Sequence, residues 1–138
     1  VYLDAVLPTN GKAFLPISVG EERIKHAKKG YLMEVPSIEE FLGVPKNHKK
    51  YEWLKSNLVP HPLPTLMEQV VYIDNGIKRI PKLYVRCKRN PRVENGKIDP
   101  VLELIANDDT WSYLMIDTGH DLMITSPDET AIILSKVD

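Results

Sequence analysis

The sequence predicts an α/β protein in which three parallel strands with flanking helices are interrupted by a helical lid insertion. Two observations predict this class. After residue 80, apolar strand-like runs alternate with helix signals, an order typical of parallel strands joined by right-handed crossovers. Prolines cluster between residues 36 and 91 among short helix-like segments, which indicates a loop-rich insertion. We therefore expect a core strand and turn over residues 1–11, a helical lid or cap over 12–71 and a C-terminal α/β core segment over 72–138.

The first strand is predicted over residues 1–7, an apolar run interrupted by Asp4 and ended by a turn at residues 8–11. The chain begins inside this strand without a lead-in, so we expect a truncated polypeptide. The strand would then lack neighbours on one side and leave an open, apolar sheet edge.

The predicted lid lacks the alternation of strands. Short helices are expected over residues 21–29, after an N-cap at Ser37, and over residues 49–58. Residues 60–64 alternate proline with other residues and are expected to form an extended connector that leads to a short turn.

The second and third strands are predicted over residues 80–87 and 111–116, which are rich in apolar and aromatic side chains. An acidic or hydroxyl residue followed by proline marks a helix start, because the first can cap the helix and the second suits its first turn. Such pairs occur at residues 99–100 and 126–127, so a helix is expected after each of these two strands.

Composition excludes several classes of function. Hydrophobic residues make up 43% and charged residues 27% of the chain, as in ordinary globular domains. The net charge of −1 gives no reason to expect nucleic acid or an anionic membrane as partner, and no apolar run approaches the ~20 residues of a membrane span. Cys87 is the only cysteine, which excludes an intrachain disulfide and favours a cytoplasmic location. No cofactor is expected.

The strongest candidate for chemistry is His120. It follows the predicted strand 111–116 in the run Asp117-Thr118-Gly119-His120-Asp121, where a strand ends and a loop begins. A rigid sheet often holds a general base in such a place. A serine nucleophile on a Gly-x-Ser-x-Gly turn would complete the chemistry, but the 138 residues contain no such motif.

Several segments of the chain resemble a known family. It is similar to the C-terminal portion of α/β-hydrolases, closest to small bacterial esterase-like proteins related to plant methyl esterases and hydroxynitrile lyases. The segments that carry the resemblance are residues 1–8 with Gly11, residues 60–65 with 80–87, and residues 117–123 with Pro127. They occur in the family's order, and the histidine loop is the most specific of them.

The resemblance implies the lid-bearing and base-bearing portion of a serine hydrolase that acts on small hydrophobic carboxylic esters. His120 would take the proton of the serine and return it to the leaving group. The family's nucleophile and oxyanion loop lie upstream of the first segment, so this chain alone would be inactive. Its expected partners are the N-terminal half of the same enzyme, or another copy that covers the open sheet edge, and a small ester substrate.

The acid that would orient His120 has more than one candidate. Many relatives carry it just after the strand that corresponds to residues 80–87, where this sequence has Asn90, which can orient an imidazole but supplies no charge. In some α/β-hydrolases the acid instead follows the strand that corresponds to residues 1–7, and Asp4 is near that place. A carboxylate in an apolar run is costly unless it is paired. We favour Asp4 over Asn90, Glu94 and Asp99. Bonding to nearby backbone N–H groups is the alternative role for Asp4.

Neighbouring carboxylates have other expected roles. Asp117 and Asp121 flank His120 and are expected to hold its loop by local hydrogen bonds. Together with His120 they raise the idea of a metal site, but no second histidine has suitable local spacing, and no metal is expected. Cys87 ends a strand and is expected to be a buried structural residue, because a nucleophilic role would need a depressed pKa.

The substrate pocket is expected to include apolar side chains of the lid. The candidates are Trp53, His61, Leu63 and Met123. Core packing among lid helices is the alternative for the apolar members, and a surface turn is the alternative for His61.

Two other functions remain open at the level of sequence. A degenerate hydrolase could keep the fold and bind a ligand without cleaving it, which the missing carboxylate after residue 87 favours slightly. A lyase could reuse the same residues, since one fold hosts many functions.

Overall fold

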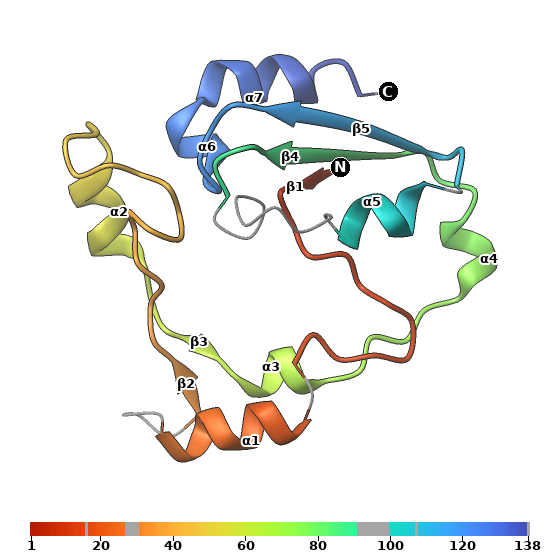
Figure 1. Cartoon of the computed structure of the whole chain (residues 1–138), viewed down its shortest axis with the longest axis horizontal. Coiled ribbons are helices and arrows are strands. Elements are labelled where there is room, and N and C mark those ends of the chain that lie inside the picture. The colour runs from red at the N-terminus through yellow and green to blue at the C-terminus, as the bar shows by residue number, and fades with distance from the viewer. Residues whose placement is uncertain (16, 27–30, 91–99, 107, 138) are drawn as a thin grey trace.

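A computed structural model describes residues 1–15, 17–26, 31–90, 100–106 and 108–137. Three strands, β1 (Tyr2–Leu3), β4 (Lys82–Cys87) and β5 (Trp111–Ile116), form a sheet in the order β1-β4-β5 (Figure 1). Both strand pairs are parallel. The α/β class and the three parallel strands are thus confirmed, and β5 has the predicted bounds.

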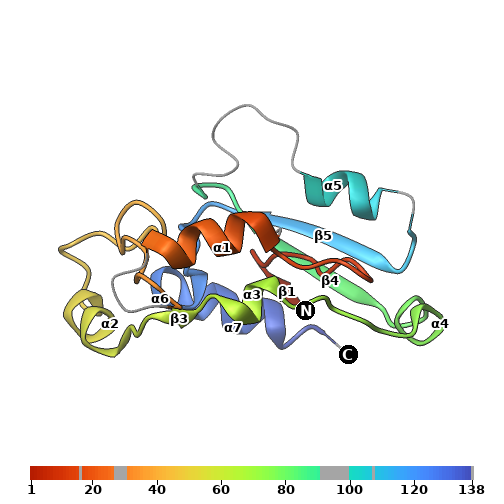
Figure 2. The same ribbon diagram turned by 90° about the horizontal axis from the view of Figure 1, so that it is seen from below.

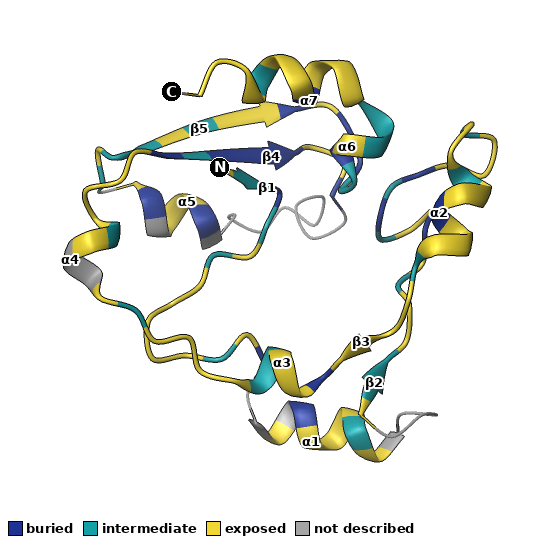
Figure 3. Cartoon of the chain, turned by 180° about the vertical axis from the view of Figure 1, so that it is seen from behind, coloured by how far each residue is buried: buried dark blue, intermediate teal, exposed yellow. Residues whose placement is uncertain are grey.

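Helices cover both faces of the sheet. Figure 2 shows α5 (Pro100–Ile105) and α7 (Pro127–Leu134) on opposite sides of β4 and β5. Because side chains alternate along a strand, those of β4 pack into two separate apolar clusters, one on each face of the sheet. The buried members are Val85, Cys87, Ile116 and Leu122 on the α7 side, and Tyr84, Val101 and Ile105 on the α5 side. The central strand is accordingly the most buried element (Figure 3).

The segment between β1 and β4 contains short helices, as predicted, and also a strand pair that was not predicted. Its helices are α1 (Ile17–His26), α2 (Tyr51–Asn57), α3 (Pro64–Met67) and α4 (Asp74–Ile77). β2 (Leu32–Met33) pairs antiparallel with β3 (His61–Pro62), and β3 lies within residues 60–64, which were expected to form an extended connector. A two-residue strand shows no alternation, so local sequence could not reveal a pairing between positions so far apart.

The largest departures from the predicted elements are at the first strand and at Ser37. The first strand was expected over residues 1–7, but β1 ends at Leu3 because the backbone of Asp4 adopts a φ of 47° and leaves the sheet. Ser37 accepts a hydrogen bond from the Glu40 N–H, as a cap would, yet only a turn follows because Gly43 and Pro45 stop the helix.

The helix α7 begins at Pro127, as predicted, but without a side-chain capping bond from Ser126. The Ser126 hydroxyl instead donates to Thr118 Oγ1 at 3.2 Å, across the loop that carries His120. A four-residue helix, α6 (Leu122–Thr125), fills the space between that loop and α7. The proposed cap Asp99 and the rival acid Glu94 lie outside the described residues.

Within the part of the chain that the structure describes, no helix has both the length and the apolar character needed to cross a membrane.

The buried clusters predict where the fold is most sensitive. Leu122 is fully buried between β4, β5 and α7, so Leu122→Ala should lower the free energy of unfolding by about 2–5 kcal/mol through lost burial and a residual cavity. Leu134→Ala, at an exposed end of α7, should cost no more than about 0.5 kcal/mol. Urea denaturation followed by far-UV circular dichroism measures both; equal losses would contradict this core assignment.

Candidate active site

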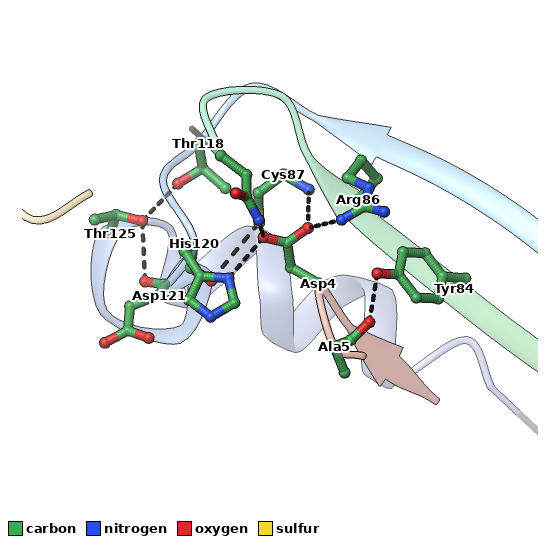
Figure 4. Close-up of polar contacts among 10 residues, drawn as sticks. Asp4, Ala5, Tyr84, Arg86, Cys87, Thr118, His120, Asp121 and Thr125 are labelled. Atoms are coloured by element: carbon green, nitrogen blue, oxygen red, sulfur yellow. Dashed lines mark hydrogen bonds and ion pairs between the residues drawn. The ribbon is translucent and has the colours of Figure 1, made fainter. Parts of the chain in front are cut away.

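The carboxyl ends of the three parallel strands bring Asp4, Asn90 and His120 together. Asp4 follows β1, Asn90 follows β4 and His120 follows β5. Because the strands are parallel, their carboxyl ends lie at the same edge of the sheet, which is where α/β proteins place their ligand sites. Figure 4 shows the Asp4 side chain at the centre of this group, with His120 beside it.

The backbone of Asp4 turns its side chain toward the end of β4. Its N–H donates to the Val85 carbonyl at 2.7 Å, one residue beyond the end of β1, and its φ of 47° then bends the chain out of the sheet. Among the non-glycine residues described, Asp4 alone has a positive φ. Aspartate tolerates this left-handed conformation better than most residues, and such backbone strain is typical of functional sites.

The carboxylate of Asp4 accepts four hydrogen bonds. Oδ1 accepts from the Arg86 guanidinium at 2.9 Å and from the Cys87 backbone N–H at 3.1 Å. Oδ2 accepts from Asn90 Nδ2 at 2.5 Å and lies 2.7 Å from Nδ1 of His120. Asp4 is 3% exposed. Burial by itself would raise the pKa of this carboxyl, but the bonds from His120, the Cys87 N–H, Asn90 and Arg86 outweigh it and hold the pKa below 3.8.

The contact with Asp4 defines the tautomer of the neutral His120 ring. An ionised carboxylate can only accept a hydrogen bond, so Nδ1 carries the proton and Nε2 of the neutral ring keeps its lone pair. No described residue hydrogen-bonds Nε2, which points away from Asp4 (Figure 4). The side chain is 23% exposed, so Nε2 can meet an incoming group. This is the arrangement that a general base needs.

The other predicted residues near the site have supporting positions. Asn90 is buried and bonds to the acid candidate, not to the imidazole. Asp117 forms an exposed ion pair with Arg89, Oδ1 to Nε 3.2 Å. Burial raises the pKa of the Asp121 carboxyl, and the nearby His120 opposes that rise.

Cys87 has the properties of a structural thiol. Its side chain is fully buried and its Sγ lies 3.8 Å from the carbonyl oxygen of His120, to which it donates. Burial and then the negative charge of Asp4 raise the pKa of this thiol to about 12. A thiolate nucleophile is therefore unfavourable here.

The predicted pocket residues differ in exposure, and they do not line either of the two cavities described below. Leu63 is buried, whereas Trp53 and Met123 are exposed. His61 is exposed and its Nε2 is bonded to Thr65 Oγ1 at 2.7 Å. Two cavities, of about 440 and 170 Å³, are lined by other residues, including Phe14 with Leu66 and Tyr2 with Trp111.

Sequence reasoning missed Arg86, which completes the surroundings of Asp4. Arg86 is 6% exposed and its guanidinium lies over the Tyr84 ring, 5.0 Å from the centroid. The signal was present, because a charged residue in the middle of a buried strand requires an opposite charge. Asp4 directly follows an apolar strand and Arg86 lies within one, and the two carry opposite charges, so each could have predicted the other.

The fold and site together define an α/β protein with an Asp–His pair at the carboxyl edge of a parallel sheet. No family model matches the chain, and neither curated proteins nor solved structures give a significant match.

The pKa of Asp4 predicts an acid-sensitive contribution to stability. Because the folded-state pKa lies below 3.8, the ionised carboxylate stabilises the fold above that pH, and this is lost as the pH falls through the folded-state pKa. Asp4→Asn should be less stable at neutral pH and lose less stability on acidification from about pH 5 to pH 2. Denaturant titrations across this range test the prediction, with Asp109→Asn on an exposed turn as control. Equal acid dependence in Asp4→Asn and wild type would contradict it.

The burial of Cys87 predicts slow alkylation. At about pH 8 the folded chain should react with iodoacetamide far more slowly than the same chain in urea, because the thiol is both inaccessible and protonated. Intact-mass spectrometry over time measures the difference. Comparable rates in the two conditions would show that Cys87 is accessible and activated.

Proposed function

We propose that Asp4 and His120 are the acid and base of a serine-hydrolase triad. The observation that carries the proposal is the 2.7 Å contact between Asp4 Oδ2 and His120 Nδ1, with Nε2 left without a hydrogen bond from any described residue. A triad needs a buried carboxylate that fixes the tautomer of the histidine and stabilises its charged form. Asp4 is buried, ionised and directed at the correct ring nitrogen.

The chemistry follows from these positions. His120 Nε2 takes the proton of a serine hydroxyl as its oxygen attacks the carbonyl carbon of an ester. Asp4 stays ionised and holds the Nδ1–H bond while the imidazolium exists. The same proton is then given to the departing alcohol, and His120 next activates water to release the acid.

The serine itself is proposed to come from polypeptide outside the 138 residues. No described serine, threonine or cysteine side chain hydrogen-bonds Nε2, and the sequence has no Gly-x-Ser-x-Gly motif. The burial and high pKa of Cys87 argue against that residue as a replacement. The other part of the same enzyme is the proposed partner.

Small hydrophobic esters are the proposed substrates, with residues 12–71 as the lid. An aromatic side chain of this segment supports the idea: the Phe41 ring lies edge-on to the His120 ring, with centroids 5.3 Å apart. It gives the base an apolar neighbour. A small acyl or alcohol group would find such a surface more favourable than a charged one.

The test uses the complete gene product or complex that contains these residues, treated with a fluorophosphonate probe. We expect one adduct on a serine outside the 138 residues. His120→Ala should slow labelling and the hydrolysis of short-chain p-nitrophenyl esters by about 10²–10⁴-fold, because the general base is lost. Intact-mass and peptide mass spectrometry locate the adduct.

His48→Ala is the matched control, since His48 is not a pocket candidate and its Nδ1 already accepts a hydrogen bond from the Lys50 N–H. It should keep wild-type labelling. Asp4→Asn should resemble His120→Ala, because an asparagine favours the wrong tautomer of the imidazole. Absence of any adduct, or normal labelling of His120→Ala, would refute the proposal and favour a protein that binds without cleaving.

A further inference from the structure

A turn of the lid is bonded directly to the loop that carries His120. The Asp121 N–H, next to the base, donates to the carbonyl of Leu42 at 2.9 Å. Leu42 belongs to the turn at residues 41–44, which leads toward α2 and is far from His120 in the sequence. The loop of the base is therefore attached to the lid by main-chain bonding as well as to its own sheet.

Two glycines allow this close approach. A Cβ built on Gly119 would lie 2.6 Å from the Gly43 carbonyl oxygen, and a Cβ built on Gly43 would lie 2.6 Å from the Gly119 Cα. Both distances are shorter than any normal contact, and the atoms that each Cβ would meet belong to the backbone and cannot rotate away as a side chain can. Gly43 also has a φ of 71°, a conformation that favours glycine.

Side chains extend the contact on both sides of the glycines. Phe41 packs edge-on against the His120 ring, and Ile124 of α6 packs against the lid's apolar cluster. The buried members of that cluster are Ile38, Leu42, Val44 and Leu54. The apolar packing stabilises the docked position, while the glycines determine how close it is.

On its other side the His120 loop is held by the sheet. The Cys87 thiol donates to the His120 carbonyl at 3.8 Å, and Asp4 bonds to the ring. The base thus lies between the end of β4 and the lid turn. The main chain of its loop is contacted from both sides, by the Cys87 thiol and by the Leu42 carbonyl, which restricts where the His120 side chain can point.

We propose that the lid turn formed by Phe41, Leu42, Gly43 and Val44 is a positioning element for His120, so that the base is aligned with Asp4 only while this turn is docked. The catalytic meaning of this positioning rests on the proposed function. Displacement of residues 37–58 would then regulate the same site by separating the base from its acid. Phe41 and the Gly43–Gly119 contact act through His120 and touch no reacting atom.

The test is a comparison of glycine variants in the 138-residue chain by proton NMR. The signal to follow is the Nδ1 proton of His120, which we expect to resonate far downfield while it is donated to the Asp4 carboxylate. Gly43→Ala should abolish it, because the added Cβ forces the lid turn away from Gly119. Gly11→Ala is the matched control: its φ of 74° imposes a similar strain, but a Cβ there meets nothing within 4 Å.

A second pair removes backbone strain from the comparison. Gly119→Ala should also abolish the signal, whereas Gly76→Ala, where a Cβ again meets nothing within 4 Å, should leave it unchanged. Phe41→Ala should weaken or abolish the signal without adding any atom to the interface, and Phe41→Tyr, which keeps the ring, should restore it. Retained β4 and β5 amide resonances show that each variant is folded.

Two results would overturn the inference: a persistent Nδ1 signal in folded Gly119→Ala and Phe41→Ala, or equal loss in the Gly11→Ala and Gly76→Ala controls. A merely structural contact would lower the melting temperature without moving this signal. The readout is independent of hydrolysis. A missing serine adduct would therefore refute the proposed function and leave the positioning result to stand by itself.

Discussion

The buried carboxylate of Asp4 is the interaction on which the rest of the site depends. Removing a charge from water costs several kcal/mol, roughly, unless hydrogen bonds and an opposite charge replace the lost solvation. Here the guanidinium of Arg86, a backbone N–H of β4, the amide of Asn90 and the ring of His120 supply that replacement. One carboxylate therefore ties together the ends of all three strands. Loss of any one partner would leave the others directed at an incompletely compensated charge.

The hydrogen bonds to Asp4 also explain how its carboxyl can remain ionised although it is buried. Burial by itself would raise the pKa of this carboxyl; the hydrogen bond from His120 lowers the pKa most, followed by those from the Cys87 N–H, Asn90 and Arg86. A protonated carboxyl could not hold the imidazole in the tautomer that a triad requires. Arg86 and Asp4 together form a nearly neutral pair, so the site keeps a carboxylate that accepts from Nδ1. Asn90, which supplies no charge, has the complementary task of fixing the second carboxylate oxygen. Asp4 lies between the other two residues, because Asn90 bonds to Asp4 and Asp4 contacts His120.

The parts of this structure that local patterns determine were predictable, and those that depend on distant contacts were not. The run at residues 111–116 predicted β5 because apolar and aromatic residues favour a strand wherever it lies. The position of Asp4 in an apolar run signalled a paired carboxylate, and the pair with His120 was the favoured hypothesis. By contrast, the β2–β3 pairing and the early end of β1 come from interactions across the fold. The substrate pocket stays a prediction, because whether Trp53 or Leu63 faces a cavity depends on packing that periodicity does not encode.

The same dependence on distant contacts gives the lid turn its significance. A histidine loop on a sheet edge has freedom on the side away from the sheet, and a ring that rotates by one rotamer loses its bond to the acid. The lid turn removes that freedom through a backbone bond to Asp121 and through the contact of Gly43 with Gly119. A Cβ on either glycine would collide with the backbone of the other, so this close contact requires glycine at both positions. Under the proposed function, docking of the lid turn would align His120 with Asp4 and so link the position of residues 37–58 to the state of the site.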